Sequence, residues 1–291
     1  MSTQPDMFSK GSYPEVAPQI GSKDKSVGWY DKTFSGVTSD ARHLLEGYAH
    51  VPGAEVDSYV LDIRDKAWNI YPYPCIGQFR FLNLSLHKQP SYASLVQRLQ
   101  QGAKYLDIGC CLGQDIRKLV ADGAPSENLY GAELLGDFIQ LGYDLFRDKG
   151  TLKTHFMQAD ILDPNSQLQS LTKTVDFIHL GMILHIFSWE EQRELLETCI
   201  QIMKPQAGVL ILGQAVGHAE GKVSLGRNSG GLSFKHSDLS FRRLWGEISE
   251  RTGIKFDCRA ALDEGLGVAD GKRTWDVAAA RRLVFEVERL S

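Results

Sequence analysis

Residues 104–113 read K-Y-L-D-I-G-C-C-L-G, an apolar run that ends in an acid and two glycines. Tyr105, Leu106 and Ile108 are typical of a short, buried parallel strand. The glycines beyond them let the backbone turn sharply and lie close to a ligand. Residues 114–122 follow with the apolar spacing of a helix. This order predicts the first half of a nucleotide-type site at the carboxyl end of an α/β sheet.

The spacing of the glycines argues against a dinucleotide-binding fold. Such a fold places glycines at the first, third and sixth positions of the loop. Here Cys111 holds the third position, Gln114 the sixth, and the second glycine is Gly113 at the fifth. Diphosphate binding is therefore disfavoured, and a tight strand-to-helix turn without a ligand remains an alternative.

The composition is that of a globular protein with room for a sizeable core. The chain has 291 residues, 43% of them hydrophobic, and a net charge of −4 without a long basic run, so no nucleic-acid partner is expected. No apolar stretch approaches the roughly 20 residues of a membrane span, and the start M-S-T-Q-P-D-M does not resemble a signal peptide. Five cysteines, odd in number and not spaced as ligands, predict no metal site and a reduced, cytoplasmic location.

The chain divides into three parts by pattern. Residues 1–37 predict a flexible N-terminal segment that could act as a lid. Residues 38–102 predict a helical and aromatic cap, with helices over 40–50, 56–69 and 91–101 and Ser39 as the first N-cap. Residues 103–291 alternate strands and helices, which predicts an α/β core with a doubly wound, mainly parallel sheet.

The core elements are expected at the following places. Strands are predicted at 105–108, 128–133, 154–159, 175–180 and 209–213, and helices at 138–149, 189–203 and 237–252, the last closed by Gly253. Two final strands, 254–261 and 282–290, are expected to pair as an antiparallel edge. Residues 217–231, with five glycines, predict a loop that either covers a substrate or is disordered.

Three acids stand at or beside the ends of the first three core strands. Glu133 is placed to accept hydrogen bonds from the two hydroxyls of a ribose, and Asp160 to accept from an adenine amino group. Leu134 or Ile161 would pack on the adenine ring. Asp107 would orient the loop and meet an ammonium group through ordered water. Each acid alone could equally be a capping or solvated carboxylate.

With these three acids, the chain resembles the class I S-adenosylmethionine-dependent methyltransferases. The resemblance rests on L-D-I-G-C-C-L-G, Y-G-A-E-L, Q-A-D-I, D-F-I-H-L and a lysine-proline turn before V-L-I-L. It implies a doubly wound, mainly parallel seven-stranded sheet in the order 3-2-1-4-5-7-6, with strand 7 antiparallel and an N-terminal helical cap in front. It also implies S-adenosylmethionine as cofactor and S-adenosylhomocysteine as product, bound by Asp107, Gly109, Cys110, Gly113, Glu133, Leu134, Asp160 and Ile161.

One position departs from the D-x-G-x-G-x-G pattern of that family. Cys111 stands where the middle glycine is usual. We expect it to be tolerated if its φ is negative and its side chain points away from the methionine. Cys110 and Cys111 are interpreted as structural, because adjacent cysteines would form a strained disulfide.

A narrower resemblance lies in the front of the chain. G-W-Y-D-K, Y-P-Y-P-C-I-G-Q-F-R-F-L and the C-C-L-G variant resemble the fungal methyltransferases of meroterpenoid biosynthesis, which methylate a terpenoid carboxylic acid. This implies a hydrophobic carboxylic acid as substrate, a methyl ester as product, and a homodimer.

A carboxylate arrives ionised and needs hydrogen-bond donors rather than a base. His185, Tyr30 and Arg80 are the candidates for orienting it, and Trp29, Tyr71 and His236, the last at the rim of the crevice, for binding the rest of the substrate. His179 is expected to face the cofactor pocket or the core. A phenol, alcohol or carbon acceptor would need one of the histidines as a base. A non-catalytic fold that only binds the cofactor also remains open, and the sequence does not identify the acceptor.

Overall fold

Strand β1 (Tyr105–Ile108) lies inside a seven-stranded sheet in the computed structural model, which describes residues 21–225, 231–268, 271, 273 and 275–291. All four residues of β1 are buried. The strand order is β3-β2-β1-β4-β5-β9-β8, and β9 runs antiparallel to both of its neighbours. Since β6 and β7 form a separate hairpin, this is the predicted order 3-2-1-4-5-7-6 with strand 7 antiparallel. The predicted fold class is confirmed.

The elements of the core agree closely with the predicted ranges. The strands are β2 (Leu129–Glu133), β3 (His155–Gln158), β4 (Phe177–Gly181), β5 (Leu210–His218), β8 (Phe256–Asp263) and β9 (Ala280–Arg289). The helices are α5 (Gln114–Ala121), α6 (Gly136–Phe146), α7 (Trp189–Ile202) and α8 (Asp238–Thr252), with short 3₁₀ turns η3 (Ser126–Asn128), η4 (Gln167–Leu171) and η5 (Leu184–Ile186). Gly253 closes α8 with a left-handed φ of 72°, as predicted.

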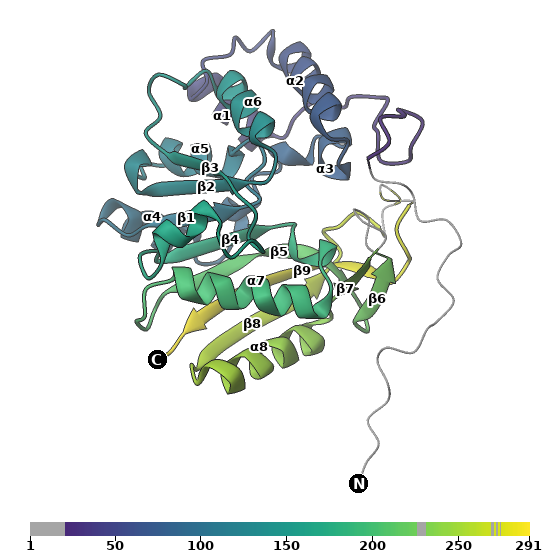
Figure 1. The fold of residues 1–291 in the computed structure, drawn as a ribbon. Helices are drawn as coiled ribbons and strands as arrows, with labels where there is room; N and C mark the ends of the chain where they lie inside the picture. The colour runs from purple at the N-terminus through teal and green to yellow at the C-terminus, as the bar shows by residue number, and fades with distance from the viewer. Residues whose placement is uncertain (1–20, 226–230, 269–270, 272, 274) are drawn as a thin grey trace.

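Helices cover both faces of the sheet. Helices α7 and α8 pack on the face that carries Leu106 and Ile178, and in Figure 1 both run across the lower half of the molecule, beside β8 and β9. Helices α4 (Tyr92–Gln100) and α5 pack on the opposite face, against Tyr105 and Phe177. Because alternate residues of a strand face opposite sides, β1 and β4 supply apolar side chains to both layers.

The front of the chain forms a cap of helices at the top of Figure 1. It comprises α1 (Ser39–Gly47), α2 (Val56–Ile70), α3 (Pro74–Gly77) and the 3₁₀ turns η1 (Arg80–Leu82) and η2 (Leu86–Lys88). The N-cap of α1 is Thr38, one residue before the predicted Ser39. Helix α2 packs on α6, and one cluster of buried side chains joins the cap to Leu112 and Phe138 of the core.

The predicted N-terminal segment is only partly described, since residues 1–20 lie outside the described residues. Residues 21–37 carry turns and bends but no helix or strand. Trp68 of α2 donates its indole N–H to the carbonyl of Lys23 at 3.1 Å, and Val27 packs against the cap cluster. The described part of this segment therefore lies packed on the cap.

The region 217–231 differs from the prediction of a loop. Strand β5 continues to His218, and β6 (Lys222–Leu225) pairs with β7 (Leu232–Lys235) in an antiparallel hairpin; residues 226–230 between them lie outside the described residues. The amide of Phe234 in β7 donates to the carbonyl of Phe187 at 2.9 Å. The hairpin is thus attached to the segment that follows η5.

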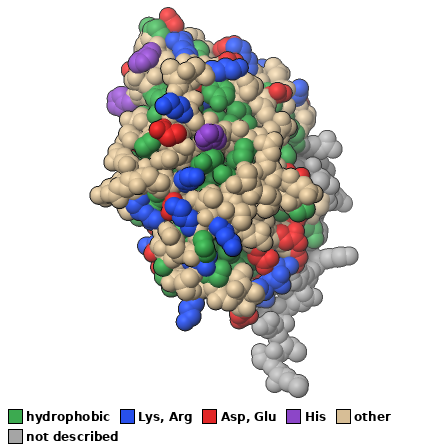
Figure 2. All heavy atoms as spheres, turned by 60° about the vertical axis from the view of Figure 1, so that its left-hand side comes forward, with side chains coloured by type: hydrophobic (Ala, Val, Ile, Leu, Met, Phe, Trp, Pro, Cys, Tyr) green, Lys and Arg blue, Asp and Glu red, His purple; other side chains and the backbone are tan. Residues whose placement is uncertain are grey.

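Basic and acidic side chains are interspersed on the face of the molecule that Figure 2 turns toward the viewer. This agrees with a net charge close to zero for the chain as a whole. Within the part of the chain that the structure describes, no helix combines the length and the apolar character needed to cross a bilayer. All five cysteines are free thiols.

Candidate active site

The loop after β1 turns by means of three left-handed residues. Gly109, Cys111 and Gly113 have φ of 71°, 52° and 67°. A Cβ on Gly109 would lie 2.5 Å from Cγ2 of Ile183, and one on Gly113 would collide with the guanidinium of Arg117. The amides of residues 109 and 110 both donate to the carbonyl of Ala132, at 2.8 and 3.1 Å. Backbone freedom and lack of space thus both require glycine at 109 and 113.

Our expectation of a negative φ at Cys111 is wrong. Its φ is 52°, in the left-handed region that costs a residue with a side chain about 1–2 kcal/mol. The Cys111 amide donates to Oε2 of Glu133 at 2.9 Å, and this bond holds the loop in its unfavourable conformation. The cysteine thus keeps the backbone shape of the usual glycine.

Glu133, at the end of β2, holds two backbone segments together. It is 7% exposed and accepts from the amides of Cys111 and Leu135, at 2.9 and 3.1 Å. Burial raises the pKa of this carboxyl above its ordinary value, against the lowering effect of the backbone bonds. A further donor that reaches the carboxylate, such as a ribose hydroxyl, would favour its ionised form.

Asp160 and two apolar side chains lie next to Glu133. The amide of Ala159 donates to the carbonyl of Glu133 at 3.0 Å, which brings the ends of β2 and β3 together. Asp160 is exposed, and its Oδ1 accepts from the amide of Leu162 at 2.9 Å. Leu134 is 53% exposed and Ile161 is 7% exposed. Two carboxylates that accept hydrogen bonds, beside an exposed apolar side chain, fit the hydroxyls, amino group and ring of a nucleoside.

Asp107 lies beneath the loop and is paired with a histidine. Its Oδ1 is 2.9 Å from Nδ1 of His179, its register partner on β4, and the two residues are 2% and 1% exposed. Burial alone would lower the pKa of His179, but the Asp107 carboxylate and nearby Asp115 raise it. His179 thus faces the interior, as predicted. The roles predicted for Asp107, orienting the loop and meeting an ammonium group, stay predictions.

Arg117, on α5, was missed by the sequence reasoning. It is fully buried and forms two hydrogen bonds with the carboxylate of Asp148, at 2.9 and 3.1 Å, while Nη1 donates to the carbonyl of Leu112 at 3.1 Å. Tyr48 of the cap donates its hydroxyl to the same Asp148 at 2.9 Å. An arginine in the first helix after the glycine loop could have pointed to a buried ion pair, but its partner Asp148 is distant in the sequence.

The turn after β4 closes the site on the other side. Met182 has a φ of 64°, and its amide donates to the carbonyl of Gln214 at 2.7 Å. Ile183 lies against Gly109, and the short turn η5 follows with His185, which is partly exposed. His185 therefore lies two residues from a side chain that touches the glycine loop.

Trp29, predicted at the substrate, faces the interior of the cap, and Tyr30 next to it packs against α2. Trp29 is 1% exposed and belongs to the buried cap cluster. The hydroxyl of Tyr30 donates to Asp65 at 3.1 Å, and its ring packs edge-on against Trp68, 4.9 Å between centroids. The prediction that Trp29 binds the substrate is therefore wrong, because its ring fills the core of the cap. Tyr30 is partly exposed, and its role in orienting the substrate stays a prediction.

The other cap residues remain partly exposed. Tyr71 packs its ring on Tyr73, 4.3 Å between centroids. Arg80 donates from Nε to Gln78 at 2.9 Å and from Nη2 to the carbonyl of Leu266 at 2.8 Å. Arg80 thereby connects the cap to the segment between β8 and β9.

The predicted rim position of His236 is also wrong. His236 is 3% exposed, and its ring nitrogens lie 3.0 Å from Oγ of Ser240 and 3.0 Å from Oε1 of Gln192. Burial lowers its pKa to about 3. The residue leaves β7 toward α8 and the core, because the region before it is a hairpin and not a loop.

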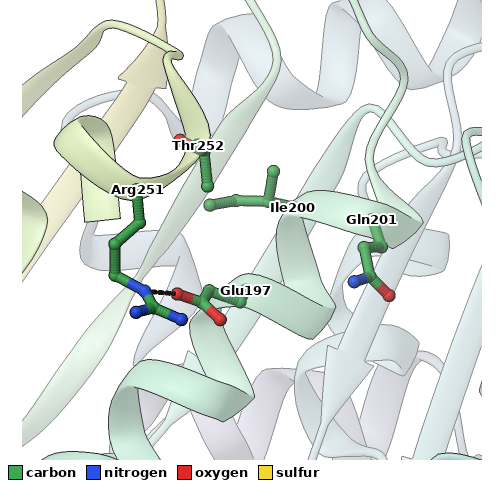
Figure 3. Close-up of a pocket in the computed structure, with 5 residues that line it drawn as sticks. All are labelled: Glu197, Ile200, Gln201, Arg251 and Thr252. Atoms are coloured by element: carbon green, nitrogen blue, oxygen red, sulfur yellow. Dashed lines mark hydrogen bonds and ion pairs between the residues drawn. The ribbon is translucent and has the colours of Figure 1, made fainter.

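A surface pocket of about 340 Å³ lies away from this site, between the C-terminal parts of α7 and α8. Figure 3 shows its lining side chains, among which Arg251 pairs with Glu197 at 2.6 Å. The pair lies at the end of the helices opposite to η5 and the glycine loop. This pocket is therefore separate from the residues described above.

Comparison with known proteins agrees with this geometry. A family described as "Meroterpenoid methyltransferase N-terminal domain" matches residues 29–82, and one described as "Methyltransferase domain" matches residues 106–206. The chain is 42% identical over 283 residues to the O-methyltransferase atr3 of Stereocaulon alpinum, covering 96% of this chain and 81% of that protein.

Two further similarities lie at greater distance. The Asnovolin E/Chermesin D methyltransferase nvfJ of Aspergillus novofumigatus is 38% identical, covering 78% of this chain and 82% of that one. The solved structure of a SAM-dependent methyltransferase from Leishmania major is 13% identical, with a TM-score of 0.49 over 97% of this chain and 99% of the other. From its relatives, its strand order and its glycine loop, the chain belongs to the fungal meroterpenoid methyltransferases, a branch of the class I S-adenosylmethionine-dependent methyltransferases.

Proposed function

We propose that this methyltransferase transfers a methyl group to the carboxylate oxygen of a hydrophobic meroterpenoid acid and so forms a methyl ester. Transfer to oxygen is supported by relatives named O-methyltransferases, among them atr3 and phiE, the latter 38% identical over 91% of this chain. A terpenoid acceptor is supported by the match of residues 29–82 to the meroterpenoid methyltransferase N-terminal domain.

The residues at the ends of β1, β2 and β3 would hold the cofactor. Glu133 would accept from the ribose hydroxyls, Asp160 from the adenine amino group, and Leu134 with Ile161 would contact the adenine ring. The loop from Gly109 to Gly113, with Cys110 between, would approach the amino-acid part through its backbone. When bound, S-adenosylmethionine supplies a methyl group that its positively charged sulfur makes electrophilic.

The observation that carries the carboxylate proposal is the burial of the histidines near the site. His179, His218 and His236 are 1%, 6% and 3% exposed. Burial lowers the pKa of His218 as well as that of His236, so neither is suited to hold a proton at neutral pH. Of the described histidines at the carboxyl ends of β4 and β5, His185 alone is partly exposed. A phenol or alcohol would have to use His185 as its base, whereas a carboxylate is already ionised and needs only a hydrogen-bond donor there.

His185 would orient the acceptor by donating a hydrogen bond to one carboxylate oxygen. Arg80 would add a permanent positive charge near the same side of the site, and Tyr71 an aromatic contact. Orienting the carboxylate and excluding water would then be enough for methyl transfer, because in-line placement of the two reactants removes much of the barrier.

Mass spectrometry tests the proposal directly. The protein is incubated with S-adenosylmethionine and a panel of terpenoid acids and terpenoid phenols. We expect acids to gain one methyl group that an esterase removes. A methylated phenol that resists the esterase would show that the acceptor is a phenol and would contradict the carboxylate proposal. Absence of any product, with S-adenosylhomocysteine still bound in calorimetry, would favour a non-catalytic, cofactor-binding role.

We also propose a homodimer, on the family resemblance alone. Light scattering after size exclusion measures the mass of the particle in solution, and a mass of 32.4 kDa, that of one chain, would contradict the proposal.

A further inference from the structure

Gln192, in the first turns of α7, ties two segments together beneath η5. It is fully buried, and its Nε2 donates to the carbonyl of Phe187 at 3.0 Å and to the carbonyl of Phe234 at 2.8 Å. Phe234 in turn donates its amide to the same Phe187 carbonyl at 2.9 Å. One side-chain amide therefore uses both of its N–H groups to fasten the end of the η5 turn to strand β7.

The oxygen of this amide determines the state of His236. Oε1 of Gln192 lies 3.0 Å from Nε2 of His236. An amide oxygen only accepts, so Nε2 must carry the proton and donate. The Ser240 hydroxyl, 3.0 Å from Nδ1, can either donate to Nδ1 or accept from it, since it also lies 3.2 Å from the carbonyl of Ser237, so the neutral state of the ring comes from its burial. In that state Nδ1 accepts from the hydroxyl.

The surroundings of His236 keep it in this state. The rings of Trp189, Phe234 and Phe241 lie around it, with centroids at 5.1, 4.8 and 5.5 Å. Burial among them lowers the pKa of His236 to about 3. The hydrogen bonds from Ser240 through His236 to Gln192 therefore do not change with pH in the physiological range.

The segment that these bonds fasten carries His185. At its start, Met182 is bonded to Gln214, and Ile183 fills the space over Gly109. At its end, Phe187 is held by Gln192 and by the hairpin. His185 lies between these two fixed ends, on a turn of three residues.

We propose that Gln192 and His236 are positioning residues for methyl transfer, which fix the turn from 182 to 187 and thereby aim His185 at the acceptor. The inference rests on the orienting role given to His185 above. Both residues are buried, so we expect neither to touch the cofactor or the acceptor. A hydrogen-bonded pair of this kind also stabilises the fold, so the test must separate the two effects.

The test combines single variants of Gln192 and His236 with a double-mutant cycle between Gln192 and His185. Gln192→Leu keeps the volume and removes all three hydrogen bonds, and His236→Phe removes the donor to the amide. We expect each to lower kcat/KM for the acceptor about tenfold or more, while affinity for S-adenosylhomocysteine changes less than about twofold. His236→Gln, which keeps a donor near the position of Nε2, should restore most of the activity. In the His185→Ala background, Gln192→Leu should have almost no further effect, because residues that act through each other are not additive.

Thr154 supplies a control away from the η5 turn. It is buried, 7% exposed, and its hydroxyl donates to the carbonyl of Ser126 at 3.1 Å, just before β3 at the edge of the sheet. Thr154→Val should lower thermal stability, as Gln192→Leu does, without the loss of kcat/KM.

Hydrogen exchange of the peptide covering residues 182–187 provides a readout that is independent of activity. Gln192→Leu should speed exchange there, and Thr154→Val should not. Unchanged exchange and unchanged kcat/KM in a folded Gln192→Leu variant would overturn the inference while leaving the proposed function intact. Equal losses from Gln192→Leu with and without His185 would also overturn it. An inactive wild-type protein would instead count against the proposed function, and exchange would still decide whether the turn is held.

Discussion

Replacing Glu133 with alanine tests the ribose assignment and the loop geometry together. In the structure this carboxylate accepts from the amides of Cys111 and Leu135, at 2.9 and 3.1 Å, and is 7% exposed. Glu133→Ala leaves both amides without this acceptor, and one of them belongs to a residue with a left-handed φ. The same change removes the charged partner of the expected ribose hydroxyls.

The size of the effect follows from these contacts. An unsatisfied buried amide costs about 1–3 kcal/mol, so two give about 2–6 kcal/mol. Burial also destabilises the ionised carboxylate, as its raised pKa indicates, so removing the carboxylate offsets part of this loss of stability. We therefore expect a loss of stability of about 2–3 kcal/mol, which lowers the Tm by about 4–12 °C. Loss of two hydrogen bonds to a charged acceptor should weaken S-adenosylhomocysteine binding by about 10- to 100-fold.

Calorimetry with S-adenosylhomocysteine and thermal unfolding measure the two quantities on the same sample. Glu133→Gln should lose less of both, since one amide oxygen remains. Glu127, exposed and just before the other end of β2, is the matched control, and Glu127→Ala should change neither. Wild-type affinity in a destabilised Glu133→Ala protein would refute the ribose assignment. Weakened affinity without any loss of stability would refute the reasoning about the loop amides.

Three further perturbations have defined outcomes. Cys111→Gly should retain S-adenosylhomocysteine binding, whereas Cys111→Val should lose it about tenfold or more, because a β-branched residue is strained at a φ of 52°; calorimetry that finds the two equal would contradict this. Arg117→Met should lower the free energy of unfolding in urea by about 3–5 kcal/mol, since Asp148 stays buried without its ion-pair partner, and Arg117→Met/Asp148→Leu should recover much of it. His236 stays neutral in the fold down to pH about 3 but is protonated below about pH 6.5 when unfolded, so the stability it contributes is complete above pH 6.5 and falls as pH drops toward 3. Urea unfolding at pH 7 and pH 5 should show a loss of about 2 kcal/mol from this group that is absent in His236→Gln, and equal losses in both proteins would refute the neutral ring.

The fold could be predicted because its decisive signals are local. Apolar runs that end in an acid or a glycine marked β1 and β2 to within one residue, and Gly253 marked the end of α8. Parallel strands bring their carboxyl ends to one edge, so Glu133 and Asp160 could be placed together without knowledge of distances.

The parts that failed depend on contacts between distant segments. The rim position predicted for His236 depends on a loop before it, whereas β6 and β7 pair as a hairpin, and K-V-S-L and L-S-F-K carry the alternation of two short strands. Trp29 is predicted at the substrate but lies in the core of the cap, since an aromatic cluster gives the same sequence pattern whether it lines a cavity or fills a core. The φ of Cys111 is set by the bond to Glu133, which nothing in the local sequence specifies.

The link from Tyr48 through Asp148 to Arg117 has a consequence for folding. Tyr48 belongs to the cap, whereas the buried ion pair and the carbonyl of Leu112 belong to the core. Helix α6 depends on the cap in the same way, since Phe138 and Leu145 are buried within the cap cluster. A protein shortened to begin at residue 103 would expose these side chains, and Asp148 would lose the hydrogen bond from Tyr48. We therefore expect the two sequence regions to unfold in one cooperative transition, and the shortened core to aggregate instead of folding alone.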